Sequence, residues 1–197
     1  MEQCVYCGLA AGETRDHVPP KNLLKKPFRP NLRTVPACGA CNRSFSQAEE
    51  YFRRILIMLF AHTQEGDEFF DSSVGRSLDR SPMIEQSVWD SLGVENGRCY
   101  TELDTDAIRQ VAEKIVKGLS YLRSARRVDP KGGFGLALYE PVNRPPAVAV
   151  ALAAAPVDSA DGPNFTFRVV DNPDREHAEF WELCFFDSFC CAVGVRK

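Results

Sequence analysis

Two Cys-x-x-Cys pairs near the start of the chain, Cys4/Cys7 and Cys38/Cys41, constrain its fold more than any other feature. Each pair can present two thiolates to one metal ion, and four thiolates at about 2.3 Å form the ligand set of a tetrahedral structural zinc site. Glycines and prolines interrupt the interval between the pairs, so this segment has little apolar core of its own. The pattern predicts a zinc-stabilised module, with four merely buried cysteines as the alternative.

The composition is that of a globular protein rather than a disordered one, with 44% hydrophobic and 26% charged residues in a chain of 197. No charged segment followed by an apolar run opens the sequence, and residues 147–157, its most apolar stretch, are far shorter than the roughly 20 residues of a membrane helix. We therefore expect a cytoplasmic protein with no membrane partner. In a reducing compartment paired thiols are more often metal ligands than disulfides, which supports the zinc prediction.

The charge is unevenly distributed along the chain. Residues 15–54 carry nine Lys or Arg and three acids, whereas the rest of the chain carries 15 basic and 24 acidic residues. Attraction to a polyanion is then confined to one end, which favours nucleic acid as the partner. Each of these residues taken alone is better explained as a solvated surface charge, but as a group they carry more weight as candidate phosphate contacts: Arg15, Lys21, Lys25, Lys26, Arg33 and Arg43.

Short strands and one helix are expected in the N-terminal module. The sequence predicts strands over 14–18 and 32–35 and a helix over 46–62, whose start could also lie nearer Asn42. The helix opens with Ser46-Gln-Ala-Glu49, which matches a capping box in which the serine and the glutamate each satisfy a backbone donor.

The whole chain is predicted to be α+β, with a module over 1–63, a linker over 64–80 and an accessory domain over 81–197 for substrate recognition or dimerisation. The accessory domain is expected to contain a short helix near 82–92 and a long one from 104 or 105 to 125. Strand-like runs suggest a small antiparallel sheet packed on the long helix: 134–139, 147–153, 165–170 and 180–195. The other cysteines lack the spacing of a second zinc site.

Asp16 and His17 fill an interval between Cys7 and Cys38 that is longer than in a zinc ribbon. A neutral imidazole, with an ordinary pKa near 6.5, can accept a proton from water at physiological pH. Oxygen atoms of Asp16 and Asn42 suit a hard divalent cation, whereas thiolates suit zinc. The alternative is that Asp16 and His17 only brace a structural finger through hydrogen bonds.

Three motifs together resemble the HNH endonuclease family and its ββα-metal fold: Cys-x2-Cys, Asp-His-Val-Pro-Pro-Lys, and Asn-Leu-x-Thr-Val-Pro-x-Cys-x2-Cys-Asn. The resemblance covers residues 4–52. It is closest to the zinc-containing branch with phage resolvases of the endonuclease VII type, in which an asparagine also follows the last cysteine. The third letter of the motif is then Asn42, which makes this an H-N-N variant.

The resemblance implies a role for each residue at the site. His17 would be the general base, Asn31 would hold the His17 loop, and Asp16 and Asn42 would bind a catalytic Mg²⁺ or Mn²⁺. A water activated by His17 would attack the phosphodiester while the metal stabilised the leaving 3′ oxygen, giving a 5′-phosphate.

Glu49 and Glu50 are candidates for an additional metal ligand, although a capping box is the simpler interpretation of Glu49. The expected function is a metal-dependent endonuclease acting on nucleic acid, with double-stranded DNA as the expected substrate. A homodimer would pair two single-strand cuts. The alternative is a noncatalytic zinc-finger adaptor that binds nucleic acid or protein.

Overall fold

A computed structural model describes the chain over residues 2–60, 92–95, 98–128, 133–160, 162–172 and 178–196. Its mixture of helices with antiparallel sheets confirms the α+β prediction. No helix in these ranges has the length and apolar character needed to span a membrane. The predicted linker over 64–80 and most of the helix near 82–92 lie outside the described residues, so the domain boundaries stay predictions.

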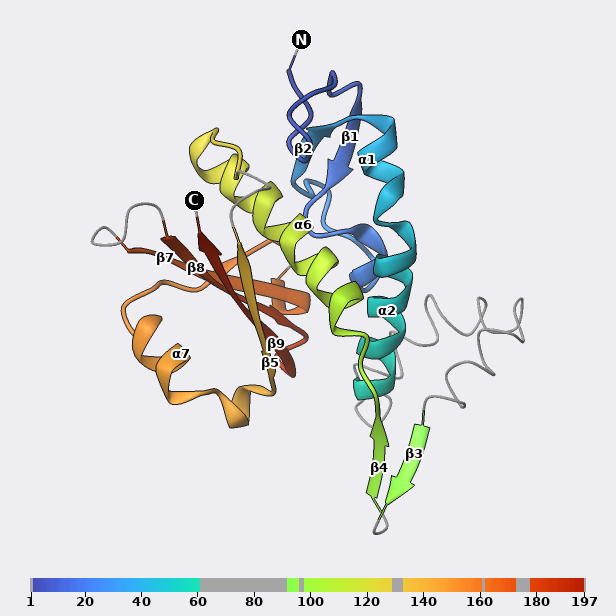
Figure 1. Ribbon diagram of the computed structural model, residues 1–197, viewed down its shortest axis with the longest axis vertical. Helices are drawn as coiled ribbons and strands as arrows, with labels where there is room; N and C mark the ends of the chain where they lie inside the picture. The colour runs from blue at the N-terminus through green and yellow to red at the C-terminus, as the bar shows by residue number, and fades with distance from the viewer. Residues whose placement is uncertain are drawn as a thin grey trace.

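The N-terminal segment folds into a two-stranded hairpin followed by two helices (Figure 1). Strand β1 (Thr14–His17) pairs antiparallel with β2 (Thr34–Ala37), which places His17 opposite Thr34. A single turn of 3-10 helix, η1 (Lys21–Leu23), lies in the connection. Helices α1 (Gly39–Ser44) and α2 (Ser46–Phe60) follow.

The capping box expected at Ser46 does not form. The backbone N–H of Glu49 donates to the carbonyl of Phe45 at 2.9 Å, and α1 ends only two residues before Ser46. The donor that a capping serine would satisfy therefore already has a helical partner. This leaves the carboxylate of Glu49 available for a tertiary contact.

Helix α6 (Thr105–Ser124) lies at the centre of the molecule, between α2 and the large sheet (Figure 1). It begins where the sequence predicts, because the Asp104 side chain accepts from the backbone N–H groups of Asp106 and Ala107. It ends at Ala125, which adopts a left-handed conformation. Its buried apolar side chains belong to one hydrophobic cluster that also includes residues of β2, α2 and the sheet.

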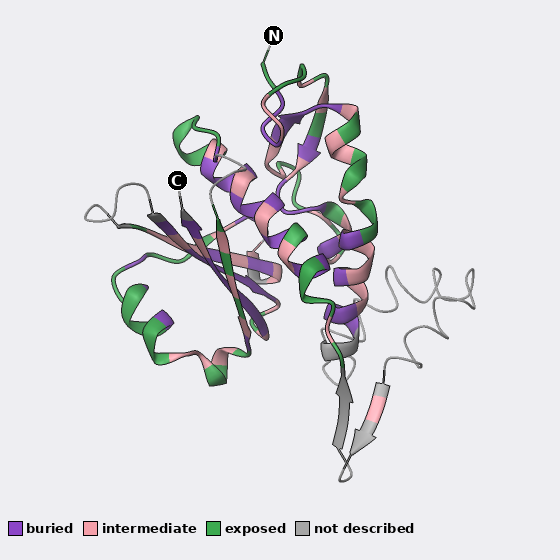
Figure 2. Ribbon diagram, in the orientation of Figure 1, coloured by how far each residue is buried: buried purple, intermediate pink, exposed green. Residues whose placement is uncertain are grey.

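The large sheet has five antiparallel strands in the order β5-β9-β8-β7-β6. A separate hairpin joins β3 (Leu92–Glu95) to β4 (Arg98–Thr101). The strands of the large sheet are β5 (Phe134–Tyr139), β6 (Asp158–Ser159), β7 (Phe165–Asn172), β8 (Ala178–Phe185) and β9 (Phe189–Arg196). The runs 134–139 and 165–170 are confirmed by β5 and β7. The run 180–195 is a hairpin of two strands, β8 and β9, and the fourth run is not a strand. The two central strands, β8 and β9, are largely buried (Figure 2).

The strand predicted over 147–153 is wrong, because this segment forms helix α7 (Pro146–Ala151). Pro146 occupies the first helical turn, where its missing N–H costs nothing, and the alanines that alternate with valine favour a helix. Val148 and Leu152 pack on the sheet face opposite α6. On that same face Cys184 and Cys190 form a disulfide, which the expectation of a reducing compartment does not predict.

Candidate functional site

The four cysteines of the two pairs converge, with all their Sγ atoms within 4.8 Å of one another. The Sγ atoms of Cys7 and Cys38 are 4.0 Å apart. Two thiolates on one tetrahedral zinc would be about 3.8 Å apart, because each bond is about 2.3 Å. The group can therefore hold one structural metal ion.

The backbone around the cysteines favours binding of a cation. Backbone N–H groups of Ala10 and Leu9 lower the pKa of the Cys7 thiol to about 6. At Cys41, burial and the neighbouring thiols raise the pKa of the thiol. Four adjacent thiolates need a compensating positive charge, which a bound metal ion supplies. Gly8 turns the first knuckle with a φ of 66°, and its N–H donates to the Cys4 carbonyl at 2.9 Å.

Asn42 connects this cysteine cluster to β1. Its backbone N–H donates to the Cys38 carbonyl at 2.9 Å, and its side-chain amide donates to Thr14 Oγ1 at 3.2 Å. Thr14 in turn donates to the carbonyl of Ala37 at 2.7 Å, so it can only accept from Asn42. These hydrogen bonds fix the orientation of the Asn42 amide. They leave Asn42 Oδ1 as a free acceptor among the described residues.

His17 ends β1 with a half-buried side chain. Burial lowers its pKa, and the positive charges of Lys21 and Lys114 lower it further against the opposing effect of Asp16. The imidazole is therefore neutral at physiological pH and can accept a proton. The next residue anchors the strand end, since Val18 N–H donates to the Arg33 carbonyl at 2.9 Å.

Asp16 is buried and points into the protein, where it contacts a residue that the sequence analysis did not single out. Lys114 Nζ lies 2.8 Å from Asp16 Oδ2, in a charge contact that lacks the alignment of a hydrogen bond. The same ammonium binds the carboxylate of Glu49. Both carboxylates therefore already have a cationic partner.

Lys114 could have been suspected from its place in the helix pattern. It lies three residues after Val111 and four before Gly118, and both of these are buried. A charged residue on such a stripe must find a partner in the interior, because an isolated buried charge is very costly. The sequence does not reveal which carboxylates it meets, since Asp16 and Glu49 are 98 and 65 positions away.

Two further candidates, Asn31 and Glu50, make no hydrogen bond or ion pair with these groups among the described residues. Asn31 is exposed before β2, and no side-chain hydrogen bond joins it to the His17 segment within the described residues. Its role as the residue that holds the loop stays a prediction. Glu50 pairs with two arginines of its own helix, Arg53 at 2.8 Å and Arg54 at 3.6 Å.

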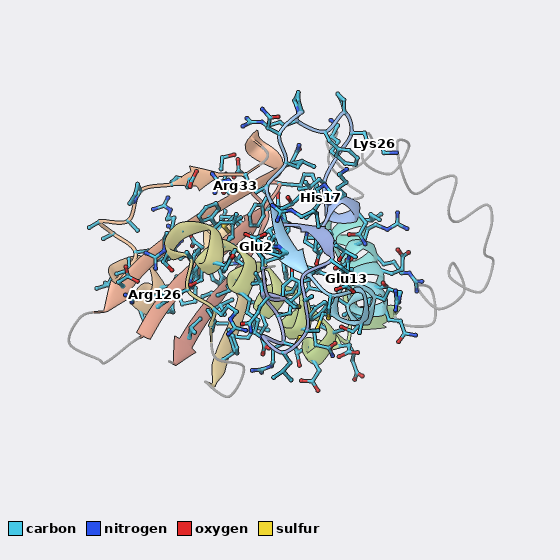
Figure 3. The ribbon with its side chains drawn as sticks, turned by 90° about the horizontal axis from the view of Figure 1, so that it is seen from above. Glu2, Glu13, His17, Lys26, Arg33 and Arg126 are labelled. Carbon is cyan, nitrogen blue, oxygen red and sulfur yellow. A yellow bond between two sulfur atoms is a disulfide. The ribbon has the colours of Figure 1, made fainter. Side chains whose placement is uncertain are left out.

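The six candidate phosphate contacts differ in their surroundings. Lys21 and Lys26 are exposed, and both ammonium groups lie over the ring of Phe28, at 5.7 and 5.8 Å from its centre. Arg33 instead pairs with Asp158 at 3.3 Å. Figure 3 views the end of the molecule where His17, Lys26 and Arg33 lie. Of the others, Arg15 pairs with Glu2, Lys25 is half-buried and Arg43 is exposed.

No protein-family model, curated protein or solved structure matches this chain. Its function is therefore argued from the site. Within the described residues the only other candidate metal group contains Glu182, Cys184 and Cys190. There the two sulfurs are bonded to each other, and Glu182 binds Tyr139 and Arg144.

Proposed function

We propose that this protein is an HNH-type endonuclease that hydrolyses phosphodiester bonds in double-stranded DNA, with zinc bound by the four cysteines. The observation that carries the proposal is the connection from Cys38 through Asn42 to Thr14. It joins the cysteine cluster to the strand that ends in His17, and a hairpin followed by helices is the order that the proposed ββα-metal module requires. What favours a nuclease over a noncatalytic finger is that His17 and Asn42 occur together at this hairpin, because an adaptor requires neither residue.

In the proposed reaction, His17 takes a proton from the attacking water. Its lowered pKa keeps the imidazole neutral and ready to accept that proton. A zinc ion held by the four cysteines would stay outside the reaction, because four thiolates leave no open coordination position. It would stabilise the fold from which β1 presents the histidine.

The resemblance assigns a divalent cation to Asp16 and Asn42. Such an ion would neutralise charge on the scissile phosphate. Asn42 Oδ1 suits it as a free oxygen acceptor, but Asp16 is ion-paired with Lys114. Asp16 therefore does not fit as a ligand in this arrangement, and we assign no step of the reaction to that ion.

The loop after β1 supplies the proposed contact with nucleic acid. Lys21 and Lys26 provide exposed positive charges, and both ammonium groups lie near the half-buried ring of Phe28. Ammonium groups attract phosphates at any sequence, and an aromatic ring adds a surface on which a base can stack. Lys21 is close enough to His17 to lower the pKa of its imidazole, so a substrate bound at this loop would have its backbone near the proposed base.

A noncatalytic zinc-finger adaptor is the second candidate, and one observation favours it. The buried contacts of Lys114 with Asp16 and Glu49 are those of a structural brace. If Asp16 only holds α6 against the hairpin, then binding of a partner needs no hydrolysis. The basic loop would serve either function.

A cleavage assay separates the two candidates. Supercoiled and linear DNA are incubated with zinc-loaded protein and Mg²⁺ or Mn²⁺, and the product ends are identified. We expect cleavage that leaves 5′-phosphates and falls by about 10²- to 10⁴-fold in His17→Gln. Val142→Ala is the control, since this side chain is 87% exposed.

The proposal fails if folded wild-type protein leaves every substrate intact, or if His17→Gln cleaves as fast as the wild type. DNA binding without cleavage, equal in both proteins, would favour the adaptor. The zinc content and unfolding midpoint of each variant must match those of the wild type, so that a loss of activity is not a loss of fold.

A further inference from the structure

The ammonium of Lys114 is enclosed on several sides. Its side chain is 2% exposed and contacts the carboxylates of Asp16 and Glu49. Its Nζ also lies over two aromatic rings, 5.2 Å from the centre of Phe45 and 5.8 Å from that of Tyr6. Aromatic faces attract cations, so all four neighbours favour a positive charge at this point.

The surroundings contain more negative than positive charge. Two carboxylates face one ammonium, and their side chains are only 9% and 13% exposed. Together with burial, Asp16 and Glu49 raise the pKa of the Tyr6 hydroxyl, which keeps that group neutral. A buried site of this composition must contain a cation, and here the protein supplies it from its own helix α6.

We propose that Lys114 is the resident cation of the Asp16 and Glu49 carboxylates and that it sets the divalent-cation affinity of this site by competing for Asp16. A metal ion can bind Asp16 only by displacing an ammonium that α6 holds in place. The inference deepens the proposed function, since it concerns the cation requirement of the same site. Its test measures metal binding and does not depend on catalysis.

The competition predicts weak metal binding in the wild type and tighter binding once Lys114 is removed. Zinc-loaded protein is titrated with Mn²⁺, and free Mn²⁺ is measured by electron paramagnetic resonance. We expect Lys114→Met to bind Mn²⁺ at least tenfold more tightly than the wild type. The gain should disappear in the double variant Lys114→Met/Asp16→Asn.

Lys117→Met is the matched control. This lysine lies on the same helix but pairs with Glu113 at 3.9 Å and contacts neither Asp16 nor Glu49. Its Mn²⁺ affinity should equal that of the wild type. Equal affinity in the wild type and Lys114→Met would overturn the inference, as would a gain that persists without Asp16.

Two further measurements apply if Lys114→Met does not fold. Lys114→Met/Glu49→Gln removes one carboxylate with the lysine, and it should show the same tightening. A comparison of the wild type with Asp16→Asn, which keeps Lys114, also gives an answer. An Mn²⁺ affinity that is the same in both supports the competition by Lys114, whereas submillimolar binding that is lost in Asp16→Asn refutes it.

The outcomes distinguish this inference from the proposed function. Protein that shows the expected Mn²⁺ pattern but never cleaves DNA would contradict the nuclease and leave the role of Lys114 intact. Cleavage that depends on His17, with no effect of Lys114 on Mn²⁺ binding, would contradict the competition alone.

Discussion

Substitution of Lys114 should destabilise the protein far more than substitution of either of its acidic partners. The ammonium is 2.8 Å from Asp16 Oδ2 and also contacts Glu49. At 2.8 Å and an effective dielectric constant of about 20, each such attraction is on the order of 6 kcal/mol before the cost of desolvation. Removing the lysine leaves two like charges buried side by side.

The expected losses follow from this charge count. Lys114→Met should lower the free energy of unfolding by about 3–5 kcal/mol, the range for a buried ion pair that loses one partner. Asp16→Asn or Glu49→Gln leaves one carboxylate on the lysine, so each should cost only about 1–2 kcal/mol. The order of the three variants is therefore predicted, as well as the size of each loss.

Urea unfolding of zinc-saturated protein, followed by circular dichroism, measures these differences. Lys117→Met is the control and should lose much less stability than Lys114→Met, because its one ion pair, with Glu113, is long and lies within the helix, and a methionine can keep the contact with the Phe134 ring. The reasoning is refuted if Lys114→Met loses no more stability than Asp16→Asn, or if it is more stable than the wild type.

Three further predictions concern the same end of the molecule. Gly118→Ala should lower the free energy of unfolding in urea by about 1–3 kcal/mol, because an added Cβ would lie 2.5 Å from the Val18 side chain. Gly135→Ala is the control and should lose little stability, because an added Cβ there has open space. Equal losses in the two variants would contradict this packing. Thr14→Val should cost about 1–3 kcal/mol by the same assay, since it removes the hydroxyl between Asn42 and Ala37, and an unchanged midpoint would show that this link does not contribute. If the loop that carries Lys21 and Lys26 binds DNA, alanine at either position should reduce the slope of log affinity against log salt by about one. Arg33→Ala should have a smaller effect, because Arg33 is already paired with Asp158. Equal slopes in all three variants would refute this assignment.

The features that the sequence predicted well depend on local patterns. The cysteine spacing predicted a group of four thiols that the structure brings together. Helix α6 has a capping aspartate and a regular apolar stripe, and β5 lies within the predicted bounds. Each of these signals is contained in one short stretch of chain.

The features that were missed depend on contacts between distant residues. The residues 146–151 are apolar enough for a strand, but Pro146 and the alanines favour a helix that covers the second face of the sheet. Glu49 was interpreted through a neighbouring serine, yet its partner is Lys114, 65 positions away. The disulfide between Cys184 and Cys190 depends on the pairing of β8 with β9.

The central claim is that Cys4, Cys7, Cys38 and Cys41 bind one zinc ion that holds β1 and α1 together. Native mass spectrometry of the purified protein tests it most directly. We expect one zinc per chain in the wild type, none in Cys38→Ser, and one in Cys191→Ser, whose substituted thiol is buried away from the cluster. A folded wild type without zinc, or Cys38→Ser that still binds one zinc, would contradict the account.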